Sequence, residues 1–579
     1  MRTKYKNSYC THNKPKWIMP NTTKHRIFVT ALARLTRVSR VIMEKQLLTY
    51  KSTRQFSDLV LDYLEGSDKL RPFFNRAPHL EQVKDQIQEK SQNYAPSTRA
   101  KLVQALTRQY QDFSLNESFD QRIKVDIQAL SSENTFTVTT GHQLNLFTGP
   151  LYFLYKIFGA INLAEQYAAQ NPGYRFLPIF WMASEDHDFE EIAHFKTGAH
   201  KINWDKQGAG PVGRLMCTDL DVVINTLDKL WGDTVMGRSM LDLFKSVYTP
   251  EITLAQATRK LVHELFKDYD LIIVDGDDAV LKSEFASIMR LELTENGCSQ
   301  AIEKTTQALS LKGYHKQVHP REINLFYCDS GLRERIIATE YGFAVDQTDM
   351  RFTQEELLDL LEKRPELFSP NALLRPLYQE RVLPNLAYIG GGAEVAYWAQ
   401  LKDCFATNGL TYPMVYLRNS VSLIPAKVEA KLKRIHLEIS DLFLPMDELS
   451  RLYVTRNSGL EVDFSAQITH LKKQFEQLYV IAQQTDASFM GAVGAQEKKQ
   501  IKGLERLEHR LLRAEKRKHA QDIERLSQMR EWLFPGGTLQ ERKENMSWGL
   551  TQIGPEFLAL LKNHIDPSDH RFTLLIYNS

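Results

Sequence analysis

The chain has 579 residues, of which 43% are hydrophobic and 25% are charged. Such a composition is ordinary for a water-soluble protein, and the length exceeds what one compact core usually holds, so we expect at least two domains. No uninterrupted apolar stretch approaches the roughly 18 residues that a transmembrane helix needs, so we expect no membrane anchor.

Residues 1–42 differ from the rest of the chain because they hold ten Lys or Arg residues and no Asp or Glu. Their apolar stretch at 27–33 is short for a secretory signal, and arginines follow it at once. We expect a basic, disordered extension or a start-site artefact, with translation naturally beginning at Met43. The five cysteines are widely scattered, which indicates reduced thiols in a cytoplasmic protein.

The middle of the chain alternates between helix and strand patterns. Short helices are expected over residues 43–130, followed by a strand at 135–139, a helix at 151–167 and a strand at 176–181. Further strands are expected at 271–274, 323–327, 386–389 and 414–417. This alternation predicts an α/β core with a parallel sheet over residues 43–420 and long insertions. In such a sheet the ligand crevice lies beyond the carboxyl ends of the strands.

After residue 420 the apolar spacing follows heptads. Apolar residues recur every three or four positions over 428–442 and 464–482, and a third, highly charged helix is expected over 496–530. These features predict an antiparallel helical coiled-coil arm over residues 421–530, which suits dimerisation at least as well as chemistry. Acidic residues interleave with the basic ones on the third helix, so we expect no nucleic-acid binding. Residues 531–579 are expected to return to the core as a terminal strand.

The first candidate site lies where the first strand ends and the next helix begins. Its residues are Thr140, Gly141, His142, Gln143, Gly149 and Lys156. With Thr148 as the N-cap, the free amides and the positive end of the helix dipole would suit a phosphate or a carboxylate. The competing interpretation is a tight turn with a capped helix and a buried histidine.

The second candidate site is the run Glu185, Asp186, His187 and Asp188, directly after the second strand. Crowding ionisable groups there is costly unless they face water, a cation or a substrate amine. A metal-dependent hydrolase would use such groups, but no further ligand at metal-site spacing supports this, so we expect no tightly bound metal. The other alternative is a solvated, acidic helix start.

The third candidate site surrounds a glycine-rich strand end. Its residues are Arg375, Tyr388, Gly390, Gly391, Gly392 and Glu394, with Arg418 and Ser420 after the next strand. Glycines at such a position let the backbone approach a ligand closely. If the sheet is parallel, all three candidate sites meet at one edge.

Several motifs occur together in a fixed order. They are Thr140-Gly141-His142-Gln143 with residues 146–152, residues 180–188, Arg375-Pro376, Tyr388-Ile389-Gly390-Gly391 with Glu394, and Pro535-Gly536 with Gln540-Glu541-Arg542. In this combination the chain resembles, from about Met43 to its C-terminus, the bacillithiol biosynthesis cysteine-adding enzyme family. The resemblance implies a Rossmann-like core with inserted segments and a helical coiled-coil domain that makes a homodimer. One departure is His142, where many relatives have glutamine.

The resemblance also implies a ligase that joins the carboxyl of cysteine to the amine of glucosaminyl malate, in the last step of bacillithiol biosynthesis. Because a free carboxylate is a poor electrophile, we expect ATP with Mg²⁺ to activate cysteine. His142, Gln143 and Lys156 would then stabilise phosphate charge beside the glycines of the first and third sites.

The remaining candidate residues would handle the other groups of the substrates. Residues 185–188 would bind Mg²⁺ or the substrate amines, and Glu394 would hold an amine or act as a general base. Arg375 or Arg418 would clamp the malyl carboxylates. The alternative function is a nucleotide-binding coiled-coil dimer with a regulatory or scaffold role, which predicts normal thiol pools in a deletion strain. A catalytic and a structural role are both open for residues 540–542.

Overall fold

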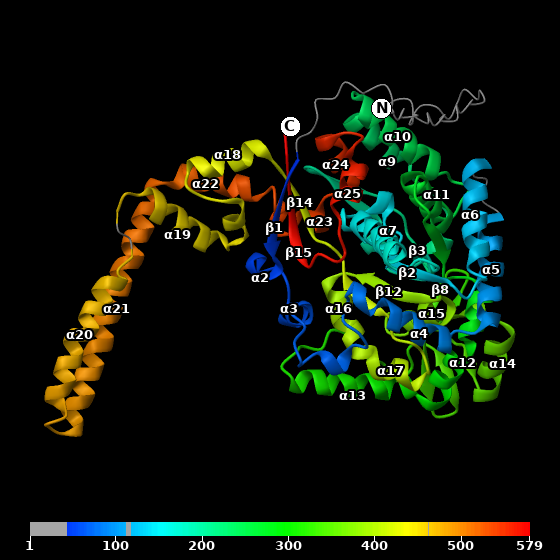
Figure 1. Ribbon diagram of the computed structural model, residues 1–579, viewed down its shortest axis with the longest axis horizontal. Helices are drawn as coiled ribbons and strands as arrows, with labels where there is room; N and C mark the ends of the chain where they lie inside the picture. The colour runs from blue at the N-terminus through cyan, green and yellow to red at the C-terminus, as the bar shows by residue number, and fades with distance from the viewer. Residues whose placement is uncertain (1–42, 112–116, 461–462, 579) are drawn as a thin grey trace, which may run out of the picture. The chain divides into compact units, whose positions relative to one another are not determined.

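The computed structural model describes residues 43–111, 117–460 and 463–578. The predicted basic extension at residues 1–42 lies outside the described residues. A five-stranded parallel sheet organises the first part of the described chain (Figure 1). In spatial order its strands are β13 (Met414–Leu417), β12 (Asn385–Gly390), β2 (Thr135–His142), β3 (Arg175–Met182) and β6 (Ile272–Asp275). The predicted α/β class and parallel sheet are therefore confirmed.

Alternate residues of β3 divide the apolar core between the two faces of this sheet. Phe180 and Met182 pack on one face with α7 (Tyr152–Gln170) and α11 (Leu254–Phe266). Ile179 and Trp181 pack on the other face with helices from a later part of the chain. Those helices are α12 (Ala279–Glu295) and α15 (Arg375–Val382). Because both faces are covered, the strand ends are where polar side chains collect.

The strand order of this parallel sheet has a topological switch point at β2. From β2 the chain continues to β3 and β6 on one side, whereas β12 and β13 lie on the other side. A crevice beyond the carboxyl ends of β2 and β12 is the ligand position that this topology favours.

The helices before β2 support the sheet from outside. They are α2 (Tyr50–Thr53), α3 (Asp58–Leu64), α4 (Val83–Asn93), α5 (Pro96–Gln111) and α6 (Glu117–Ala129). The sequence predicted these short helices. It did not predict β1 (Met43–Thr49), which pairs antiparallel with the last strand of the chain. A strand that pairs with a partner more than 500 residues away leaves no local signal.

Two long insertions interrupt the parallel sheet, as the spacing predicted. The first holds α8 (Phe189–Ile192), β4 (His194–Thr197), β5 (His200–Asn203), α9 (Asp221–Trp231), α10 (Val235–Val247) and α11. The second holds α12, α13 (Gly297–Leu311), β7 (Leu325–Asp329), β8 (Leu332–Thr339), β9 (Gly342–Val345), β10 (Arg351–Phe352), α14 (Gln354–Lys363), β11 (Phe368–Pro370) and α15.

The strand predicted at 323–327 does not belong to the parallel sheet. It forms β7 in an antiparallel sheet with the order β10-β9-β8-β7-β11. A short apolar run looks alike in both kinds of sheet, because its residues are buried in either case. After β12 the chain returns to the parallel sheet through α16 (Gly392–Trp398) and α17 (Lys402–Thr407).

The last part of the chain combines a small sheet with a helical hairpin. The sheet has the order β1-β15-β14, with β14 (Val421–Pro425) and β15 (Arg571–Tyr577) parallel. The hairpin pairs α20 (Ser465–Ala482) with α21 (Ala487–Lys518), which lie side by side (Figure 1). The remaining helices are α18 (Ala426–Arg434), α19 (Met446–Asn457), α22 (Ala520–Arg530), α23 (Gln540–Lys543), α24 (Met546–Ile553) and α25 (Phe557–His564). The predicted coiled coil and terminal strand are confirmed.

The prediction of a first heptad helix over residues 428–442 is wrong. Over 428–442 the chain does not form one helix, because α18 ends at Arg434 and a separate 3-10 turn covers Ile439–Phe443. The side chains of Val428, Leu432, Ile439 and Leu442 are buried in the main core instead of a coiled-coil seam. Among the described residues, no helix is long and apolar enough to cross a bilayer.

Candidate functional site

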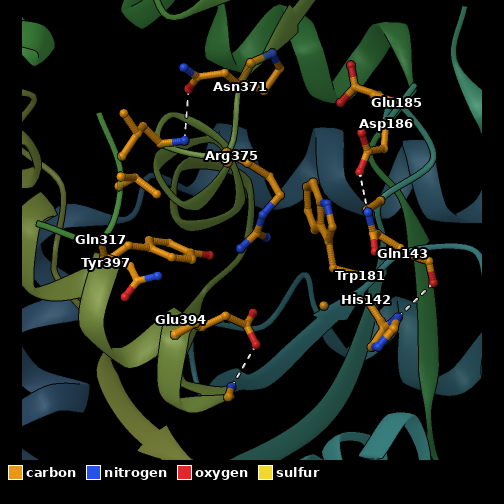
Figure 2. A pocket seen from close by; sticks show the side chains of 18 of the residues that line it. His142, Gln143, Trp181, Glu185, Asp186, Gln317, Asn371, Arg375, Glu394 and Tyr397 are labelled. Atoms are coloured by element: carbon orange, nitrogen blue, oxygen red, sulfur yellow. Dashed lines mark hydrogen bonds between the residues drawn. The ribbon is translucent and has the colours of Figure 1, made fainter. Parts of the chain in front are cut away.

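A cavity of about 800 Å³ opens beyond the carboxyl ends of the parallel strands (Figure 2). Thirteen of the residues singled out in the sequence line it: Gly141, His142, Gln143, Lys156, Glu185, Asp186, His187, Arg375, Tyr388, Gly391, Gly392, Glu394 and Arg418. They lie near the ends of β2 and β12, directly after β2, β3, β12 and β13, or on the helices beside these strands. The three candidate sites therefore form one cavity.

Lys156 joins two of these sites at the centre of the cavity wall. Its Nζ donates a hydrogen bond to the carbonyl of Gly141 at 2.8 Å and lies 2.5 Å from Oε2 of Glu394. Glu394 also accepts from the Tyr388 hydroxyl at 2.5 Å and from the Gly391 N–H at 2.7 Å. Lys156 and these donors hold the pKa of Glu394 at about 2, against the desolvation that would raise it. Glu394 is thus ionised and satisfied, so the predicted role of a general base does not fit it.

His142 is a neutral side chain whose tautomer the structure fixes. Its Nδ1 lies 3.0 Å from the carbonyl oxygen of Gln143. A carbonyl only accepts, so Nδ1 carries the proton and Nε2 is left as an acceptor. Burial, together with the charge of Lys156, lowers the pKa of His142 to about 3. The prediction that His142 donates to a phosphate therefore does not fit this state of the protein.

The lowered pKa of His142 predicts a loss of stability in acid. Between about pH 6.5 and 3 the unfolded chain binds the proton that the folded chain excludes, so stability falls as the pH falls. When the pH is lowered from 7 to 5, the free energy of unfolding should therefore decrease by about 2 kcal/mol less in His142→Gln than in the wild type. Urea titrations at the two pH values measure this difference. His200→Gln, at an exposed position, is the control, and equal pH profiles for all three proteins would contradict a neutral, buried His142.

The acidic group after β3 is held by contacts from several elements. Gln143 donates from Nε2 to Asp186 Oδ2 at 2.8 Å, which ties the β2 turn to the β3 turn (Figure 2). Glu185 Oε1 lies 2.7 Å from Nζ of Lys282, which also contacts Asp277 at 3.0 Å. Burial raises the pKa of Glu185, although Lys282 opposes this. Glu185 is therefore a better proton acceptor than Glu394, whose pKa is lowered.

His187 connects this group to the second insertion. Its Nδ1 lies 2.7 Å from NH1 of Arg333 on β8. Because a guanidinium only donates, Nδ1 accepts, and the imidazole proton is on Nε2. Asp186 Oδ1 lies 3.7 Å from the same Nδ1, which would be an ion pair only for a charged ring. The Arg333 contact is the shorter of the two, so it orients the ring.

Two backbone amides at the start of α7 are not free, contrary to what the sequence suggested. Its N-cap is Leu151, so the predicted N-cap role of Thr148 is wrong. The N–H of Leu151 donates to the carbonyl of Glu544 at 2.7 Å, and that of Phe153 donates to the carbonyl of Pro150 at 3.0 Å. These amides are already bonded within the protein, which argues against an anion site at this helix start.

Both predicted carboxylate clamps have partners of their own. Arg375 donates to Gln379 at 3.0 Å and to the Tyr388 hydroxyl at 3.4 Å. Arg418 is 4% exposed and forms an ion pair of 2.8 Å with Glu541, which is 1% exposed. Glu541 therefore has a structural role, because it neutralises Arg418 inside the protein.

The rest of the 540–542 motif divides between structure and cavity. Gln540 accepts from the N–H of Leu423 at 2.9 Å and donates to its carbonyl at 3.0 Å, in the manner of an added strand residue. Arg542 is exposed and lines the cavity. Its charge also acts on Tyr152, another cavity residue.

The remaining five residues singled out in the sequence do not line the cavity, and each has another place in the fold. Thr140 donates to the carbonyl of Ile389 at 2.9 Å, and Ser420 donates to Glu541 at 3.1 Å. Asp188 caps α8 by accepting from the N–H of Glu191. The other two, Gly149 and Gly390, belong to the β2–α7 turn and to the end of β12.

Several other lining residues were not among the site residues predicted from the sequence, although Tyr152, Trp181 and Arg542 belong to its motifs. They are Tyr152, Trp181, Gln317, His319, Arg321, Arg333, Arg335, Asn371, Tyr397 and Arg542. Six of these ten come from the second insertion, whose approach to the strand ends depends on contacts distant in the sequence. Gln317 and Asn371 lie across the cavity from Gln143 (Figure 2).

Comparison with known proteins agrees with this arrangement. Residues 43–419 match the family model described as Bacillithiol biosynthesis BshC, N-terminal Rossmann-like domain, and residues 421–577 match Bacillithiol biosynthesis BshC, C-terminal coiled-coil domain. The chain belongs to the BshC family. The predicted Rossmann-like core, coiled-coil domain and family resemblance are thereby confirmed.

Individual relatives of the BshC family align with nearly the whole chain. One from Flavobacterium johnsoniae is 42% identical over 92% of this chain and 100% of its own length. One from Flavobacterium psychrophilum is 43% identical over 92% of this chain and 99% of its own length. Both are named "Putative cysteine ligase BshC". A putative arginyl-tRNA synthetase structure from Campylobacter jejuni covers 77% of this chain and 95% of its own, at 12% identity and a TM-score of 0.20, too low to carry an argument.

Proposed function

We propose that this protein is a cysteine ligase that joins the carboxyl of cysteine to the amine of glucosaminyl malate, in the last step of bacillithiol biosynthesis. ATP would activate the cysteine carboxyl. The relatives' name supports the ligase activity and the cysteine substrate. The cavity supports the other two substrates, since each of them is an anion.

The observation that carries this proposal is the charge of the cavity. Seven Lys or Arg side chains line it, against three Asp or Glu side chains. A cleft lined by one sign of charge raises the local concentration of ligands of the opposite sign. Nucleoside triphosphates and dicarboxylates are such ligands. The cavity also contains the carboxylates of Glu185 and Asp186, which suit the binding of an amine.

The proposed reaction has two steps. The cysteine carboxylate attacks a phosphorus atom of ATP and forms a mixed anhydride, with pyrophosphate or ADP as the leaving group. The glucosaminyl amine then attacks the carbonyl carbon, the amide bond forms, and AMP or phosphate leaves. We assign the proton of the attacking amine to Glu185, because its raised pKa makes it a better acceptor than Glu394.

Arg542 and the glycines after β12 provide the proposed nucleotide position. Arg542 and the backbone at Gly391 and Gly392 line the cavity close to the strand reversal. No cluster of three or more His, Cys, Asp or Glu side chains suited to a metal exists in the part of the chain that the structure describes. We therefore propose that Mg²⁺ enters bound to the phosphates and supplies charge neutralisation there.

The proposal predicts product from three substrates. Purified protein given ATP, Mg²⁺, cysteine and glucosaminyl malate should form bacillithiol, detected by mass spectrometry, and the nucleotide product distinguishes AMP from ADP. His142→Ala should reduce the rate at least about 10-fold, because it removes a lining side chain that packs against Tyr152 and Phe153. His200→Ala is the control. Nucleotide binding without any product would instead support a regulatory role.

The coiled-coil hairpin supports the proposal of a homodimer. Leu478, Val480, Ile481, Phe489 and Leu507 on α20 and α21 are between 42% and 58% exposed. Apolar side chains gathered on one hairpin favour contact with a second protein surface. We propose the cytoplasm as the compartment, since the four cysteines among the described residues are free and buried.

A further inference from the structure

Two exposed arginines from the second insertion line the cavity. Arg321 lies in the segment before β7, and Arg335 lies on β8, and both are exposed. Neither side chain has an ion pair or a hydrogen bond within residues 43–111, 117–460 and 463–578. His319, two residues before Arg321, is exposed and also lines the cavity. Arg321 and Arg335 therefore form a cationic wall, and no described side chain neutralises either of them.

Three cations on the sheet side of the cavity have partners within the protein. Lys156 is paired with Glu394, and Arg418 is paired with Glu541. Arg375 donates to the side-chain amide of Gln379 and to the hydroxyl of Tyr388. An anionic group that enters the cavity therefore gains most from cations that lack such partners among the described residues, as Arg321 and Arg335 do.

The strand geometry places Arg335 next to a fixed guanidinium. Arg333 and Arg335 are two residues apart on β8, so their side chains leave the same face. Arg333 is held by His187, by Ser369 Oγ at 3.2 Å and by the carbonyl of Pro370 at 3.2 Å. Arg335 stands opposite Phe326 on β7, whose ring lies 4.0 Å from the Arg333 guanidinium. The free cation is thus carried on a rigid part of the wall.

A buried amide fixes the segment that carries Arg321. Gln400 is 1% exposed and accepts from the N–H groups of Gln317 and Val318 at 3.0 and 3.1 Å. It also donates to the carbonyl of Val318 at 3.0 Å. Next to the segment, the N–H of Arg321 donates to Asn324 Oδ1 at 3.1 Å. The segment has no regular secondary structure, but these four hydrogen bonds position its backbone.

We propose that Arg321 and Arg335 bind the two carboxylates of the amine substrate, and this inference rests on the proposed function. His187 bonds to Arg333 and directly follows Asp186, so the acidic end of the cavity adjoins the cationic wall. A ligand with one amine and two carboxylates matches this layout. ATP has no basic aliphatic amine, and cysteine has a single carboxylate. Arg542 remains for the phosphates of the nucleotide.

Steady-state kinetics of Arg321→Gln and Arg335→Gln test the assignment. Each change should raise the KM for glucosaminyl malate about 10-fold or more, as expected for the loss of a hydrogen-bonded ion pair. The KM values for ATP and cysteine should stay within about twofold. Arg351→Gln is the matched control, because Arg351 is exposed on β10 of the same sheet but does not line the cavity.

A substrate without carboxylates gives the second readout. Methyl glucosaminide keeps the amine and lacks the malyl group, so the variants should use it as well as the wild type does. An equal loss of kcat/KM on both amine substrates, or a KM increase for ATP, would overturn the proposal. Calorimetric binding of glucosaminyl malate without ATP separates this inference from the ligase activity. If the wild type makes no product but the variants still lose binding, the ligase function fails and the dicarboxylate site stands.

Discussion

Glu394→Gln should lower product formation at least about 100-fold and the free energy of unfolding by about 3 kcal/mol. The change leaves Lys156, whose side chain is 6% exposed, without the carboxylate that lies 2.5 Å from it. Burial already lowers the pKa of Lys156, and Glu394 is the main group that opposes this. Without Glu394 the ammonium is disfavoured, and both the charge and the position of the Gly141 turn change. Product formation by mass spectrometry and urea unfolding at pH 7 measure the two effects.

A double variant separates stability from function at this pair. In Lys156→Met with Glu394→Gln, no unpaired charge is buried, so most of the lost stability should return while activity stays low. Asp359→Asn is the control, because its ion pair with Lys363 at 2.7 Å is largely exposed and should contribute less than about 1 kcal/mol. Full activity in Glu394→Gln would show that catalysis does not use the charge of Lys156.

The sequence predicted the parts of this site that lie at strand ends. The β-rich run before Gly141 and the apolar run before Glu185 became the parallel strands β2 and β3. Polar residues directly after such runs must meet at one edge of a parallel sheet. This rule explains why Gln143 and Asp186, 43 residues apart, form a hydrogen bond of 2.8 Å.

The sequence could not predict the insertion side of the cavity. Arg335 belongs to an antiparallel sheet whose position over the strand ends depends on distant contacts, such as that between His187 and Arg333. The segment at Gln317 is fixed by Gln400, 83 residues away. Neither contact leaves a local pattern. The wrong prediction of a heptad helix over 428–442 has a similar cause. Apolar spacing there indicates that the residues are buried, but it does not indicate which elements cover them.

Partners of charged groups were also beyond prediction. Arg418 was expected to bind substrate because it follows a strand of the sheet. In the structure its guanidinium lies over the ring of Tyr152 and forms an ion pair with Glu541, 123 residues later. A strand end indicates where a side chain lies, but which charge is free depends on the whole fold. This is why the unpaired Arg321 and Arg335 matter more for substrate binding than Arg418 does.

Glu541→Gln should destabilise the protein by about 3–5 kcal/mol, the largest effect that we expect from a single ion pair in this chain. Glu541 neutralises Arg418 at 2.8 Å with both side chains buried, and it also accepts from the N–H of Val421 at 3.2 Å. The variant keeps the shape of the side chain but leaves a buried guanidinium without a counter-charge. Urea unfolding at pH 7 gives the free energy difference from the wild type.

Glu448→Gln provides the matched comparison for this prediction. Glu448 pairs with Arg54 at the same distance of 2.8 Å, but these side chains are 53% and 52% exposed. Water and salt screen such a pair, so its removal should cost less than about 1 kcal/mol. If the two variants lost similar stability, the buried pair would not hold β13, β14 and α23 together. A large loss only in Glu541→Gln would show that desolvation, and not the distance between the charges, determines the cost of breaking the pair.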